Sequence, residues 1–192
     1  MRKIAILCLI GALALCSAPL MASTFVAMSH KQLVAQADTI VQGQVVGVDS
    51  FWSESGRLIV TEARVKVHET LLGTAPAEVT VRTFGGQVGN FAVEAPGFPK
   101  FEEGREVILF LTLSNDDGSI RVLGYQQGHY RVVERLDGVT VVAPQVEDGV
   151  RYLKANGKLA APARSYTLDE FRAGIRDLAI KTGRLAGVQL SK

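Results

Sequence analysis

The sequence predicts a mainly β protein: a small, closed antiparallel barrel of six or seven strands, with a short helix before the strands and an amphipathic helix after them. Three observations support this prediction. Residues 58–69 alternate between charged and small apolar side chains. Residues 107–113 form a continuous apolar run between turns. Short runs rich in β-branched residues recur at hairpin spacing between residues 39 and 143.

The two longest strands are predicted at residues 39–48 and 58–69. In the second strand the apolar residues share one parity, so one face meets a core while the charged face meets water. The first strand contains Gly43 and Gly47. Glycine costs about 0.5–1 kcal/mol inside a regular strand. The two glycines therefore predict bulges or a tight bend, as in an OB-like barrel, with two ordinary sandwich strands as the alternative.

The most irregular stretch is residues 84–101, which holds four phenylalanines, four glycines and two prolines. A loop of this length without regular structure is more often functional than connective. Shorter strands surround it, bounded by glycine-containing and aspartate-containing turns. They are predicted at residues 78–83, 107–113, 120–125, 128–134 and 139–143.

Two capping boxes predict the helices. Ser29 and Gln32 have the spacing of the first, so a short helix should run from there to about Ala37. Thr167 and Glu170 form the second. The helix that follows has an apolar face at helical spacing and a basic opposite face, and we expect it to pack on the barrel.

The first 22 residues have the pattern of a secretory signal peptide: a basic start, an apolar stretch and small residues before the cleavage site. Cleavage is predicted after Ala22, which places the mature protein in the periplasm or outside the cell. Lipid attachment at Cys16 is disfavoured because Leu15 is too large for the preceding position. Both cysteines, Cys8 and Cys16, leave with the signal peptide, so the mature chain should lack disulfides and thiolate metal sites.

Charge is unevenly spread over the mature chain. The precursor has 21 basic and 19 acidic residues, and Arg2 and Lys3 belong to the signal peptide, so global charge gives no argument for nucleic acid. Residues 23–150, the predicted barrel domain, are acidic, whereas residues 151–192, the predicted linker and C-terminal helix, are basic. The basic segment either docks on its own acidic body or faces an acidic partner or lipid surface.

No pattern indicates an assembled active site. His30, His68 and His129 lie far apart without the paired spacing of metal ligands. The chain has no G-x-S-x-G nucleophile elbow, and Gly85–Gly89 is not followed by the Gly-Lys-Ser/Thr of a phosphate loop. We therefore expect no metal, no cofactor and no enzymatic activity.

Three segments resemble known proteins: residues 37–45 (ADTIVQGQV), 69–73 (ETLLG) and 101–111 (FEEGREVILFL). They are similar to a group of small secreted bacterial proteins without assigned activity and, more distantly, to the netrin-like domain of tissue inhibitors of metalloproteinases. The resemblance implies an OB-type barrel. The animal inhibitors engage zinc through an N-terminal cysteine held by disulfides. The mature chain lacks cysteine, so the resemblance transfers neither that mechanism nor any site residue.

The function that these observations favour is a secreted, non-enzymatic binding module for a protein partner in the envelope or outside the cell, such as a co-secreted protease. Aromatic residues on glycine-rich loops are the candidate contacts. The residues concerned are Phe51, Trp52, Phe84, Phe91, Phe98 and Phe101. The aromatics at the tip of the first hairpin either fold back as a lid on the core or face the partner.

Two alternatives remain. OB-type folds also bind oligosaccharides through a strand face and adjoining loops, so an envelope polymer is the second candidate ligand, with Trp52 stacking on a sugar ring. A cryptic hydrolase that uses His68 or His129 is the third, although neither histidine has an evident nucleophile beside it.

Overall fold

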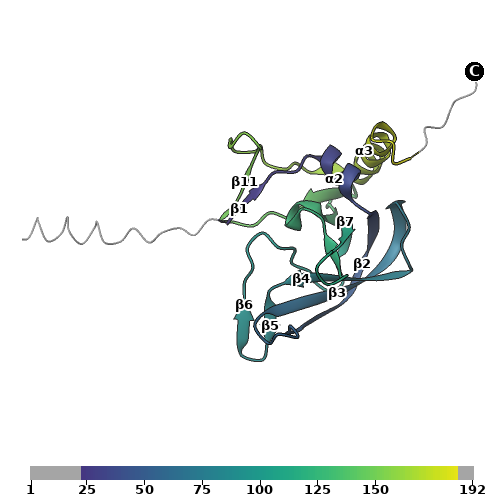
Figure 1. Cartoon of the computed structure of the whole chain (residues 1–192). Helices are drawn as coiled ribbons and strands as arrows, with labels where there is room; N and C mark the ends of the chain where they lie inside the picture. The colour runs from purple at the N-terminus through teal and green to yellow at the C-terminus, as the bar shows by residue number, and fades with distance from the viewer. Residues whose placement is uncertain (1–22, 186–192) are drawn as a thin grey trace, which may run out of the picture.

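The computed structural model describes residues 23–185. Five strands form a closed barrel (Figure 1). They are β2 (Thr39–Trp52), β3 (Ile59–Leu72), β4 (Glu78–Phe84), β7 (Glu106–Leu113) and β8 (Ile120–Val122). β2 pairs with β3 and β7, and β3 pairs with β4. β8 closes the ring because it pairs with β7 antiparallel and with β4 through one parallel bridge. The predicted mainly β fold with a closed barrel is confirmed, but the ring has five strands instead of six or seven, and its closing bridge is parallel.

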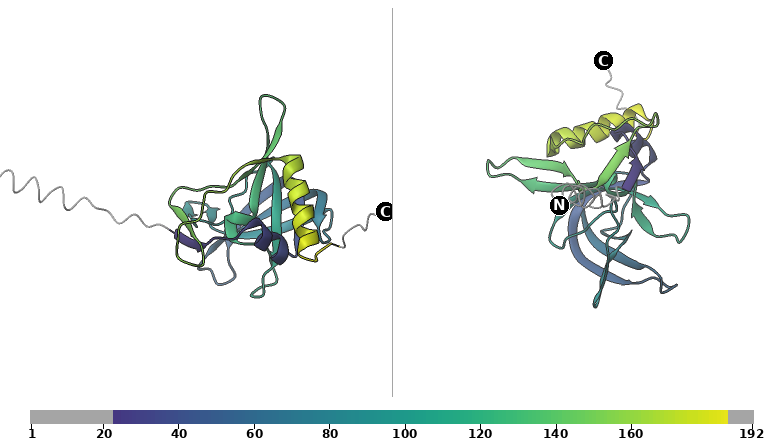
Figure 2. Two further views of the ribbon diagram at one scale, coloured as in Figure 1. Left: turned by 90° about the horizontal axis from the view of Figure 1, so that it is seen from above. Right: turned by 90° about the vertical axis from the view of Figure 1, so that its left-hand side faces the viewer.

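The sheet continues beyond the barrel. The first half of β7 pairs with β9 (His129–Glu134), which pairs with β10 (Thr140–Pro144), and β12 (Tyr166–Thr167) forms the edge. The helices α2 (His30–Gln36) and α3 (Leu168–Lys181) cover this extension. The turn between β9 and β10 projects from the body (Figure 2).

Two hydrophobic cores result. One fills the barrel and consists mainly of valines and leucines from β2, β3, β4 and β7. The other lies between the helices and the sheet extension, where the rings of Phe110, Tyr130 and Phe171 meet. Both predicted capping boxes are formed, by Ser29 with Gln32 and by Thr167 with Glu170. The two helices therefore begin where the sequence predicts.

The predicted bulges in β2 are present. The register between β2 and β3 shifts between Gln42 and Gly43 and again between Val45 and Gly47. A Cβ atom at Gly43 would collide with the backbone carbonyl oxygen of Lys66 on β3. Glycine thus allows the two backbones to approach where the strands bend around the barrel.

The chain differs from the prediction in further places. The strand predicted at residues 120–125 ends at Val122, and a 3₁₀ helix begins at Tyr125. The stretch 84–101 is not wholly irregular, because β5 (Gly86–Val88) and β6 (Phe91–Val93) form a short hairpin within it. β2 extends to Trp52, so the first turn is shorter than predicted. The N-terminal strand β1 (Ser23–Val26) pairs in parallel with β11 (Val150–Leu153), a contact that the sequence did not indicate.

The predicted signal peptide, its cleavage site and both cysteines lie outside the described residues. Within residues 23–185, neither helix has the length and apolarity needed to cross a membrane.

Candidate functional site

The β5–β6 hairpin lies at the end of the barrel opposite the helices (Figure 1). An exposed aromatic contact joins it to the β2–β3 hairpin. The rings of Trp52 on β2 and Phe91 on β6 meet edge to face, with centroids 5.7 Å apart. The two residues nevertheless remain 41% and 65% exposed. This pair therefore stabilises the position of the rings without closing them into a core.

Hydrogen bonds hold the β5–β6 hairpin against the barrel. The Thr61 hydroxyl donates to the carbonyl of Gly85 at 2.7 Å, and the Gly85 N–H donates to the carbonyl of Ile59 at 3.0 Å. Gly86 has φ +124°, and a Cβ atom there would collide with the hydroxyl groups of Ser50 and Thr61. Glycine at this position lets the hairpin backbone lie directly on β2 and β3.

A row of apolar residues crosses the outer face of three barrel strands. Phe51, Val60 and Phe84 are aligned in register on β2, β3 and β4. Two arginines lie over the rings: the Arg82 guanidinium carbon is 5.9 Å from the Phe51 centroid, and that of Arg121 is 5.1 Å from the Phe84 centroid. Phe51 is 37% exposed.

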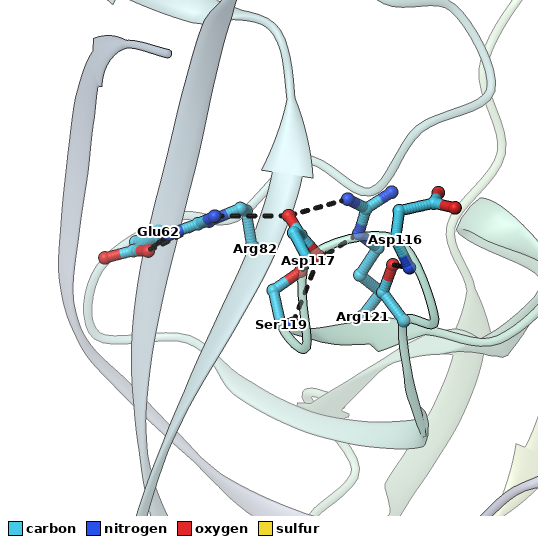
Figure 3. Close-up of polar contacts among 7 residues, drawn as sticks. Glu62, Arg82, Asp116, Asp117, Ser119 and Arg121 are labelled. Atoms are coloured by element: carbon cyan, nitrogen blue, oxygen red, sulfur yellow. Dashed lines mark hydrogen bonds and ion pairs between the residues drawn. The ribbon is translucent and has the colours of Figure 1, made fainter. Parts of the chain in front are cut away.

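An ion-pair network fixes the two arginines (Figure 3). Arg82 donates to Glu62 at 2.6 Å and to Asp117 at 3.2 Å, and Arg121 donates to Asp117 at 2.9 Å. The Ser119 hydroxyl and N–H, with Arg121, hold the pKa of Asp117 well below its usual range. Asp117 is therefore a carboxylate at neutral pH, and its ion pair with Arg82 links the β7–β8 turn to β4.

Phe84 and Phe98 belong to a chain of packed rings instead of a free loop surface. Phe98 contacts Phe84 and Tyr125, with centroids 5.3 and 4.9 Å apart. Tyr125 in turn contacts Phe25 on β1 at 4.9 Å. Tyr125 has φ 60°, a left-handed conformation that is uncommon for a bulky residue and that marks a strained turn at the start of the 3₁₀ helix η1 (Tyr125–Gly128).

Phe101 lies at a third place. Its ring stacks on the buried His129 ring, with centroids 4.9 Å apart. Burial lowers the pKa of His129 to about 4, against the hydrogen bond that its Nδ1 donates to Gln145 Oε1, which raises the pKa. The six predicted aromatics thus form separate groups. Phe51, Trp52 and Phe91 are exposed, whereas Phe84, Phe98 and Phe101 are half-buried against other rings.

The histidines do not form a catalytic arrangement with a nucleophile. His30 Nε2 bonds to the Tyr130 hydroxyl at 2.7 Å, His68 contacts Glu106 at 3.2 Å, and His129 contacts Gln145 at 3.2 Å. Within residues 23–185, no three His, Cys, Asp or Glu side chains are grouped closely enough to hold a metal ion.

Sequence reasoning did not identify the charged network formed by Glu62, Arg82, Asp117 and Arg121. Strand alternation places Glu62 and Arg82 on the polar face, and this signal was available. The contribution of Asp117 depends on β8 pairing with both β4 and β7, which no local pattern encodes.

Comparison with known proteins gives no relative for this chain: no protein-family model, no curated protein and no solved structure matches it. The geometry of the site is therefore the basis for the functional argument.

Proposed function

We propose that this protein is a non-enzymatic binding module whose exposed aromatic end docks on a protein partner in the envelope or outside the cell. The observation that carries the proposal is the Trp52–Phe91 pair, which two hairpins hold in place and leave open to solvent. Aromatic anchors of this kind dominate the binding energy of many protein interfaces.

The hairpins that carry this pair bear further exposed hydrophobic side chains. The β2–β3 and β5–β6 hairpins carry five exposed hydrophobic residues, and we call this group the aromatic end. It consists of Phe51, Trp52, Leu58, Phe91 and Val93. Charged residues flank it along the chain, at Arg57 and Glu94. An apolar centre with a polar rim is the usual anatomy of a protein interface.

Partner capture with variants of the aromatic end tests the proposal. The mature protein should retain a specific partner from culture supernatant, and Trp52→Ala with Phe91→Ala should reduce capture at least about tenfold. The melting temperature should change little, because both rings are exposed. Leu136→Ala is the matched control, since Leu136 is fully exposed at the distant β9–β10 turn. Equal capture by all variants, or unfolding of the double variant, would refute the proposal.

The second candidate is an oligosaccharide or another envelope polymer on the outer face of β3 and β4. The aligned row of Phe51, Val60 and Phe84 beside the Arg82 network favours it. Titration with the polymer should change Trp52 fluorescence, and Arg82→Ala should weaken polymer binding. Capture of a protein partner should instead depend on Phe91. A glycan array without any response would leave only the protein partner.

A further inference from the structure

A groove of about 680 Å³ lies between the β1–β11 pair, η1 and the connection that leads to β12. None of its lining residues belongs to the aromatic end or to the outer barrel face, so neither candidate function uses it. Its volume is within the range of about 300–1,000 Å³ typical of small-molecule sites.

The walls of the groove are largely apolar. Met28, Pro144, Tyr152 and Tyr166 contribute to them, together with the segment 159–163. These side chains favour a ligand with an apolar body, because they would be removed from water when it binds.

The floor of the groove has a polar group without a partner. Gln126 is only 1% exposed, and its Nε2 makes no hydrogen bond. The Tyr152 hydroxyl is also buried without a partner. Burial raises the pKa of the Tyr152 hydroxyl, and the neighbouring Gln126 side chain opposes this effect. The two groups are therefore close enough to interact, and neither has another hydrogen-bond partner within residues 23–185. A ligand oxygen that accepts from the Gln126 amide would satisfy this buried donor.

The charges at the groove are predominantly positive. Arg151 and Arg164 line it, and neither has a carboxylate partner among the described residues. The one lining carboxylate, Glu147, is already bound by Lys100 Nζ at 2.6 Å and by the Gly97 N–H at 2.8 Å. Burial and the nearby Arg164 charge lower the pKa of His30, which keeps this lining residue neutral at pH 7. The groove therefore offers cationic donors, and its one carboxylate is already paired.

We propose that this groove binds a small amphipathic anion, with a carboxylate or phosphate head group held by Gln126, Arg151 and Arg164 and an apolar chain along Met28 and Tyr152. Guanidinium groups suit both head groups because they donate in a planar fork. The apolar walls distinguish this ligand from free inorganic anions.

Calorimetric titration of the mature protein with octanoate, octyl phosphate and octanol tests the proposal. At least one anion should bind with one-to-one stoichiometry and about tenfold more tightly than octanol. A preference for octanoate or for octyl phosphate identifies the head group. Absence of binding up to about 5 mM, or equal binding of octanol, would overturn the proposal.

Variants localise the site. Arg151→Ala with Arg164→Ala should remove the preference for anions, and Gln126→Leu should weaken anion binding while the melting temperature stays the same or rises. Arg135→Ala is the matched control, because Arg135 pairs with Asp137 at the distant β9–β10 turn. Unchanged binding in the double arginine variant, which alters only exposed side chains, would refute the assignment. Trp52→Ala should leave octanoate binding unchanged, so this test is independent of the aromatic end.

Discussion

Arg172 on α3 reaches the carboxylate of Glu69 on β3, with Nη2 and Oε2 2.6 Å apart. The same nitrogen donates to the side-chain oxygen of Gln42 on β2 at 2.8 Å. Arg184, beyond the helix, donates to the carbonyl of Ala35 on α2 at 3.1 Å. Basic residues of the C-terminal region thus contact the body of the same chain, as one of the two interpretations of the charge asymmetry predicts.

Arg172→Ala should therefore lower the free energy of unfolding by about 1 kcal/mol, because half-exposed ion pairs contribute about 0–1 kcal/mol and a hydrogen bond is lost as well. Urea denaturation measures this change. Arg176→Ala is the control, since Arg176 is exposed on the same helix and has no ion pair within residues 23–185. Equal stability of the two variants would show that Arg172 does not contribute to docking.

Substitution of alanine for two glycines should change the stability of the protein in opposite directions. Gly43→Ala should destabilise the protein by about 1–3 kcal/mol, because the added methyl group collides with the Lys66 backbone. Gly174→Ala on α3 should stabilise it by about 0.5–1 kcal/mol, since open space surrounds that position and alanine favours the helix. Thermal unfolding compares the two variants. Stabilisation by Gly43→Ala would contradict the bulge as the reason for glycine.

The barrel was predictable because its strands are encoded locally. Alternation in β3, the apolar run of β7 and the paired glycines of β2 each follow from one short segment. Both helices were predictable for the same reason, since a capping box occupies four consecutive residues.

The remaining contacts depend on residues far apart in the chain. β1 pairs with β11 across more than a hundred residues, and neither strand has a pattern that selects the other. The aromatic groups were missed for a similar reason. Phe98 is close in sequence to Phe101, yet Phe98 packs on Tyr125 and Phe101 on His129. Composition identified the aromatic residues, but tertiary contacts decide which of them remain exposed.

Trp52 and Phe91 should show a small, measurable coupling. Each alanine variant should cost less than about 2 kcal/mol, and the double-mutant cycle should give a coupling of about 0.5–1.5 kcal/mol, as for other edge-to-face pairs. Leu109→Ala, in the barrel core, should cost about 2–5 kcal/mol and serves as the comparison. If Trp52→Ala lowered the free energy of unfolding as much as Leu109→Ala, the Trp52 ring would be part of the structural core.

Stability should fall between about pH 6.5 and pH 4 because His129 is buried in its neutral form. Burial lowers its pKa from 6.5 to about 4 in the folded protein, so the unfolded chain binds more protons in this interval. The free energy of unfolding should therefore decrease as the pH falls, by up to about 3 kcal/mol at 1.36 kcal/mol per pKa unit. Below the folded pKa this contribution stops changing.

His129→Gln isolates this contribution, because glutamine does not titrate and retains a polar side chain beside Gln145. Urea denaturation at several pH values should show that the free energy of unfolding depends less on pH in the variant than in the parent protein. The pKa of His30 is also lowered, and the pH dependence that arises from His30 remains in both proteins. Parallel profiles for the variant and the parent protein would show that His129 is not the group that limits stability in acid.

Because Phe101 stacks on His129, Phe101→Ala should admit water, bring the His129 pKa closer to 6.5 and flatten the profile in the same way.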